Sequence, residues 1–157
     1  MAGTLAGTLL GGVLGLVNTR MQLKTQLVGE RRKLIVGKLE ELHQVLSQFK
    51  QAFWDLSLMA GSHAAMEELI KQYSSIPADK LDMLVGFYAP ELSASLKKIK
   101  QLSGEYVQAL AQLVGWENKD EETRQGILSA TASLKKKLDE ACLEMQAGVI
   151  TLARKYI

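Results

Sequence analysis

The sequence is poor in cysteine, histidine and proline, and each shortage excludes a class of structure or chemistry. Cys142 is the only cysteine, which excludes an internal disulfide and a metal site built from several thiolates. The two prolines, Pro77 and Pro90, lie in the middle of the chain and leave long proline-free stretches on either side. A strong charge of one sign is also missing. The net charge of +2 is too small to indicate nucleic-acid binding.

What the sequence has instead is a composition suited to long helices. The 157 residues are the length of one domain, and 47% of them are apolar, which is enough for a core. Leucine, alanine, glutamine, lysine and glutamate dominate the proline-free stretches, and all of them are good helix formers. No strand pattern or internal repeat interrupts these stretches. We therefore expect an all-α fold.

The first seventeen residues form an uncharged, glycine-rich segment, MAGTLAGTLLGGVLGLV. As a helix it spans about 25 Å, slightly less than the hydrocarbon core of a bilayer, and Asn18 and Thr19 can extend it. A secretory signal peptide would carry basic residues before the apolar run, and this sequence has none there. The segment therefore predicts a transmembrane helix over residues 1–19, continuous with an antiparallel cytosolic helical bundle over residues 20–157. The alternatives are a buried, glycine-rich core helix and a re-entrant segment.

Basic residues follow this segment and set its expected orientation. Under the positive-inside rule they keep the C-terminal side of a span in the cytoplasm. We therefore expect a single-pass protein of the inner (cytoplasmic) membrane, in contact with lipid. The basic side chains expected at the membrane surface are Arg20, Lys24, Arg31, Arg32 and Lys33.

Glycine spacing within the segment predicts assembly. Four glycines recur at four-residue intervals, so they share one face of a helix, and in a bilayer such a face lets a second helix approach closely. Because the chain has one candidate span, the second helix must come from another chain, and we expect a homo-oligomer. The alternative is that small residues are merely common in spans. The predicted oligomerisation residues are Gly3, Gly7, Gly11 and Gly15, and the candidate pore-lining residues beside them are Thr4, Thr8 and Gly12.

Apolar residues at three- and four-residue spacing predict the helices of the bundle. Three of the helices are long and amphipathic and two are short, as in an antiparallel bundle. Seven residues of the last helix are expected on its buried face: Ile127, Leu134, Leu138, Cys142, Met145, Val149 and Leu152. The first helix is expected to run from the N-terminal segment to about Met59, and the others over 62–73, 78–88, 90–117 and 121–156.

No catalytic or metal-binding pattern is present in the sequence. His43 and His63 lie outside any HExxH motif or cysteine–histidine cluster. No serine lies in a GxSxG setting, and no P-loop is present. We therefore expect no enzyme activity, no metal, no cofactor and no nucleic-acid partner.

The layout of the chain resembles that of small bacterial proteins with one N-terminal span and a cytosolic helical bundle. Among them it is similar to the membrane-pore accessory protein of type VI CRISPR systems, which has a degenerate HEPN-like bundle. The likeness includes the segment KLEELH, in which Lys38 precedes His43 by five residues where HEPN ribonucleases have an arginine. Lysine lacks the guanidinium fork, which argues against nuclease activity. The resemblance implies a ring of subunits that forms a membrane channel with a role in antiviral defence.

Three functions therefore remain open. The first is an oligomeric membrane pore or effector, favoured by the glycine face and by the absence of catalytic motifs. The second is a membrane-tethered scaffold or adaptor whose bundle binds a partner protein. The third is a soluble helical enzyme or toxin whose first segment is only a buried helix.

Overall fold

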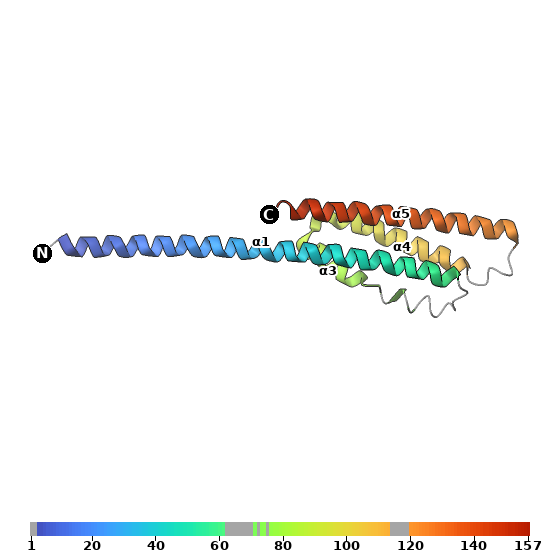
Figure 1. The fold of residues 1–157 in the computed structure, drawn as a ribbon, viewed down its shortest axis with the longest axis horizontal. Helices are drawn as coiled ribbons and strands as arrows, with labels where there is room; N and C mark the ends of the chain where they lie inside the picture. Colours follow the sequence, from blue (N-terminus) through green and yellow to red (C-terminus); the bar gives the residue numbers. More distant parts are fainter. Residues whose placement is uncertain (1–2, 62–70, 72, 75, 114–119) are drawn as a thin grey trace.

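The computed structural model describes residues 3–61, 71, 73, 74, 76–113 and 120–157, with residues 3–19 and 59–61 described by their backbone alone. Over these residues the chain forms helices and no strand, which confirms the predicted all-α class (Figure 1). The helices are α1 (Gly3–Gly61), α3 (Ala78–Tyr88), the short 3-10 helix η1 (Pro90–Leu92), α4 (Ser93–Leu113) and α5 (Glu121–Ala153).

Helix α1 is continuous over 59 residues because nothing in its sequence interrupts it. The first proline of the chain, Pro77, lies well beyond its end. At 1.5 Å per residue α1 is about 88 Å long. Its second half lies in the bundle, whereas its first half projects beyond the other helices (Figure 1).

The bundle is built from the second half of α1 together with α3, α4 and α5. Helices α4 and α5 lie against each other and against α1, and the short helix α3 lies against α1 and α4 (Figure 1). One hydrophobic core fills the space between them. Its largest fully buried side chains include Leu39, Leu42, Leu46 and Leu56 of α1, Leu81 and Leu84 of α3, Ile99 and Tyr106 of α4, and Met145 of α5.

Local capping and packing signals fix the ends of the later helices. Asp120 caps α5: its carboxylate accepts hydrogen bonds from the backbone N–H and the hydroxyl of Thr123, each at 2.8 Å. These bonds lower the pKa of Asp120. Where η1 meets α5, a Cβ on Gly148 would lie 2.8 Å from a methyl carbon of Leu92, so glycine allows this close approach. The expected helix over 78–88 and the expected start of the last helix at 121 are both confirmed.

The predicted buried face of the last helix is confirmed for five of its seven residues. Leu138, Cys142, Met145, Val149 and Leu152 are buried in the core, whereas Ile127 and Leu134 are partly buried at its edge. The last helix ends at Ala153, slightly earlier than expected. The helix expected over 62–73 falls largely outside the described residues.

The predicted location in a membrane is wrong. Among the helices of the described residues, α1 included, none combines enough length with enough apolar character to cross a bilayer. The physical reason lies in the composition of the first segment. Its glycines and threonines contribute little hydrophobicity, and Asn18, Thr19 and Arg20 follow it directly. The expectation of a single-pass inner-membrane protein with its bundle in the cytoplasm is therefore corrected.

Candidate docking surface on the projecting helix

The surroundings of α1 change abruptly at Ile35. From Arg20 to Leu34 every residue except Gly29 is exposed. Ile35 is the first residue of the helix found packed against the core, and Leu39 is the first to be fully buried. Residues 20–34 therefore form an exposed helix that is held at one end by the bundle, where Arg32 and Lys33 line a hollow together with Tyr156 and Ile157.

The apolar pattern of α1 does not change where the surroundings do. Residues seven apart lie nearly above one another on a helix, and α1 has an apolar residue at every seventh position through its described side chains. Three residues of this row are buried in the bundle, and Ile35 is half-buried at its edge. Beyond that edge Met21 is 65% exposed and Val28 is 47% exposed. In order, the row consists of Met21, Val28, Ile35, Leu42, Phe49 and Leu56.

A second apolar row runs along the same side of the projecting helix. It consists of Leu23, Leu27 and Leu34, and each of these side chains is more than half exposed. The opposite side of the helix is polar and includes Gln22 and Gln26. The two rows together form an amphipathic surface, which we call the α1 stripe: Met21, Leu23, Leu27, Val28, Leu34 and Ile35.

Basic side chains lie between the two rows of the α1 stripe. At the helical repeat, Arg20, Lys24 and Arg31 fall in the gap that separates the rows, Arg32 borders the row of Met21 and Val28, and Lys33 lies on the far side. Residues 20–35 hold these five basic side chains and one acidic one, Glu30, so their net charge is five minus one, +4. The other residues therefore carry +2 minus +4, or −2. None of the five forms an ion pair with another residue in the part of the chain that the structure describes.

An ion-pair cluster holds α1 where it enters the bundle. The Glu41 carboxylate lies 2.8 Å from the ammonium of Lys38, one turn away, and 2.8 Å from that of Lys80 on α3. The hydrogen bond from Lys38, and then that from Lys80, lower the pKa of Glu41 to about 2. Lys38, the lysine of KLEELH, thus pairs with Glu41, and His43 of the same segment is half-buried. The cluster links α1 to α3 next to the base of the projecting helix.

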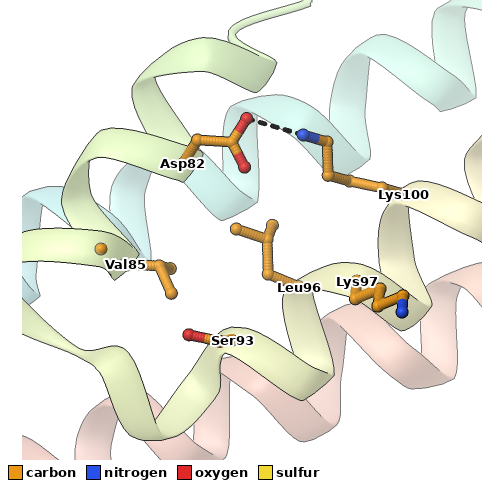
Figure 2. A pocket seen from close by; sticks show the side chains of 7 residues that line it. Asp82, Val85, Ser93, Leu96, Lys97 and Lys100 are labelled. Atoms are coloured by element: carbon orange, nitrogen blue, oxygen red, sulfur yellow. Dashed lines mark hydrogen bonds and ion pairs between the residues drawn. The ribbon is translucent and has the colours of Figure 1, made fainter.

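The largest groove between α3 and α4 has no catalytic arrangement. It encloses about 320 Å³ and is lined by residues that include Val85 and Leu96. Asp82 and Lys100 face each other across it, with the carboxylate 2.6 Å from the ammonium (Figure 2). The Ser93 hydroxyl donates a hydrogen bond to the carbonyl oxygen of Pro90 at 2.6 Å. The lining contains neither histidine nor cysteine, and its Asp82 and Lys100 pair with each other, not with the Ser93 hydroxyl.

The remaining chemistry-bearing residues do not come together either. Within the described ranges no group of three histidine, cysteine or acidic side chains could hold a metal ion. Cys142 is fully buried, and burial, followed by the charge of Asp139, raises the pKa of its thiol to about 12. His63 lies outside the described residues.

The glycine face of the first segment stays a prediction. The backbone of α1 is helical from Gly3 onward, so the spacing of Gly3, Gly7, Gly11 and Gly15 does place them on one face. Their surroundings lie outside what the structure describes, as do those of Thr4, Thr8 and Gly12. The assignment of Arg20, Lys24, Arg31, Arg32 and Lys33 to a membrane surface loses its basis with the predicted span.

The sequence analysis did not predict the α1 stripe, because it assigned all of residues 20–157 to the bundle. Leu27 and Leu34 have the same spacing as the buried leucines that follow them. One signal could have separated the two groups. The gap between the apolar rows holds Arg20, Lys24 and Arg31 in the projecting helix, whereas buried positions of the bundle are almost entirely apolar.

The α1 stripe and the groove between α3 and α4 are the surfaces that bear on the function of the chain. The expected resemblance to the pore accessory protein of type VI CRISPR systems gains no support from a relative. No family model, curated protein or solved structure matches this chain.

Proposed function

We propose that this protein is a non-enzymatic adaptor that docks a helix of a partner protein on the α1 stripe. The observation that carries the proposal is the continuity of one apolar row along α1. Leu42 and Phe49 of this row pack against other helices in the bundle, whereas Met21 and Val28 of the same row are exposed. A second helix on the projecting part would bury them as the bundle buries Leu42 and Phe49.

The α1 stripe has the dimensions of a helix-docking site. Residues 21–35 extend over about 21 Å, and a helix packed along them would lie about 8–10 Å from α1, axis to axis. Fully burying one large apolar side chain contributes roughly 1.5–3 kcal/mol, and the stripe has six of them. A soluble helix that exposes so many neighbouring apolar residues along one side marks an interaction surface.

The bundle favours docking because it forms the projecting helix in advance. A short isolated helix is marginally stable in water, since its first turn is costly to form. Here the projecting part of α1 continues a helix that the core already holds, and the Glu41 pairs with Lys38 and Lys80 fix its base. A partner therefore meets a surface whose backbone is already ordered, which lowers the entropic cost of binding.

The chemistry of the described residues supports an adaptor over an enzyme. In the groove between α3 and α4, Asp82 and Lys100 pair with each other, and the Ser93 hydroxyl donates its hydrogen bond to the backbone of Pro90. Burial and the raised pKa keep the Cys142 thiol protonated and covered. The features that stand out on this chain are therefore apolar contact and charge, which suit recognition.

The proposal can be tested with a designed probe: a fluorescein-labelled helical peptide with leucine at the a and d heptad positions and glutamine at the flanking positions. Fluorescence anisotropy would measure its binding to the full chain. We expect binding that Val28→Asp abolishes, because the substitution places a charge within the apolar row.

The matched control is Gln26→Asp, which adds the same charge to the polar side of the same helix. We expect this variant to bind the probe as the unmodified chain does. Far-UV circular dichroism would show that both variants keep their helices. Equal binding by Val28→Asp and Gln26→Asp would exclude the α1 stripe as the docking site. The proposal would also be excluded if the unmodified chain bound no such probe, whether its flanking positions were neutral, acidic or basic.

A further inference from the structure

We infer that the helix docked on the α1 stripe is acidic and belongs to a different protein, not to a second copy of this chain. This inference rests on the proposed docking function and adds to it the chemistry of the partner. The observation behind it is the position of the basic side chains, which lie inside the docking surface as well as beside it.

A partner helix seated on both apolar rows would lie directly over the gap between them. That gap holds Arg20, Lys24 and Arg31, one or two turns apart. These side chains start beneath the centre of the partner, and their length lets the cationic ends reach its flanking positions, where carboxylates can form ion pairs with them. The long aliphatic stems of these residues can cover apolar surface while the charged ends reach the partner's edge. An amphipathic helix with glutamate or aspartate beside its apolar residues is therefore the complementary partner.

A second copy of this chain does not meet that requirement. Pairing two copies through their α1 stripes, in either direction, brings residues 20–35 with a net charge of +4 against the same segment, since Glu30 is its one acidic residue. Like charges juxtaposed across an interface oppose association, and the effect is strongest at low salt. Self-association through the stripe is thus disfavoured by the same side chains that favour an acidic partner.

The pattern also favours a helix over an anionic lipid surface. A helix that lies in a membrane interface keeps its basic residues on the polar side and an unbroken apolar side toward the acyl chains. Here Arg20, Lys24 and Arg31 divide the apolar side into two rows. One row is continuous with Leu42 and Phe49, which pack against helices in the bundle.

The experiment compares three probes of the design given above that differ only in their flanking positions: glutamate, glutamine or lysine. Anisotropy would measure binding of each to the full chain at low and at high salt. We expect the glutamate probe to bind more tightly than the glutamine probe by about tenfold or more, and the lysine probe to bind weakest. High salt should reduce these differences, since it screens the exposed charges.

Charge-neutral variants locate the effect on the α1 stripe. The double variant Lys24→Gln/Arg31→Gln keeps both apolar rows, so we expect it to bind the three probes about equally. The control is Lys33→Gln, which removes one charge from the far side and should keep the preference for glutamate that Arg31→Gln, a single substitution in the gap, should weaken. If the control loses the preference and the first variant keeps it, the inference about the gap is wrong.

The remaining outcomes separate this inference from the proposed function. Equal binding of all three probes by the unmodified chain would overturn the acidic partner and leave helix docking intact. Dimers in sedimentation that Val28→Asp dissociates would show that a second copy occupies the stripe, which also overturns it. If no probe binds, both proposals fail. Binding to vesicles of phosphatidylserine and phosphatidylcholine without binding to the glutamate probe would likewise overturn both.

Discussion

The two halves of α1 can be compared directly by making the same substitution in each. Leu42 is 0% exposed in the bundle, and Leu27 is 64% exposed on the projecting part. Replacing a buried leucine with alanine removes its contacts and leaves a cavity, which costs about 2–5 kcal/mol. Replacing an exposed leucine changes the free energy of unfolding by no more than about 0.5 kcal/mol. The change in helix propensity is the same for both variants, because each replaces leucine with alanine within one helix.

Thermal and urea unfolding followed by far-UV circular dichroism would measure both variants. For a chain of this size 1 kcal/mol shifts the Tm by about 2–4 °C, so we expect Leu42→Ala to melt about 4–20 °C lower. We expect the Tm of Leu27→Ala to stay within about 2 °C of the unmodified chain. A comparable loss at both positions would refute the argument, because Leu27 would then be buried against something in the free protein. Repeating the measurement over a range of protein concentrations would show whether Leu27 is buried against a second copy of the chain.

Three further outcomes follow from individual side chains. The Tyr106 hydroxyl is buried and forms no hydrogen bond of good geometry among the described residues, although the nearby Ser57 side chain offsets part of the rise that burial causes in its pKa. We therefore expect Tyr106→Phe to raise the free energy of unfolding by no more than about 1 kcal/mol. A loss of stability in urea unfolding would show that the hydroxyl is bonded. The pKa of Glu41 is lowered from 4.5 to about 2, so its ion pairs stabilise the fold above pH 4.5, and that stability is lost as the pH falls to about 2. Stability measured across this window should therefore fall less steeply in Glu41→Gln, and an unchanged slope would contradict the assignment. Burial raises the pKa of Cys142 to about 12, so its thiol should react with Ellman's reagent only as the chain unfolds. Rapid reaction of the native protein would place this thiol at the surface.

The helices that carry their own start and stop signals could be predicted from the sequence. Pro77 and Pro90 bracket α3, and Asp120 caps α5 with acidic residues in the first turn after it. These signals act within a few residues of the boundary they set, so no knowledge of the fold is needed to read them. The buried face of α5 followed from spacing alone, because a helix in a bundle turns its apolar residues to the core.

The location of the first segment and the extent of the bundle could not be predicted in the same way. The absence of charge over seventeen residues suggested a span, but glycine and threonine make an uncharged segment without making it apolar enough. Spacing also fails to distinguish Leu34, which is exposed, from Leu39, which is buried. Both continue a regular apolar pattern, and only the lengths of the other helices determine which of them is covered.

Those lengths explain why the α1 stripe is left uncovered. Helix α5 has 33 residues and α4 has 21, so they extend about 50 Å and 32 Å along the bundle, against about 88 Å for α1. Beyond Ile35 the described part of the chain has no helix to cover α1. A row that served only the bundle could become polar at that point without loss of stability, since exposed positions contribute little. Met21 and Val28 keep the row apolar for two more heptads, and Arg20, Lys24 and Arg31 add a charge pattern that the buried face of the bundle does not have. These apolar residues do not stabilise the bundle, and basic residues lie between them at fixed helical spacing. An acidic amphipathic helix is the partner that such a surface would complement.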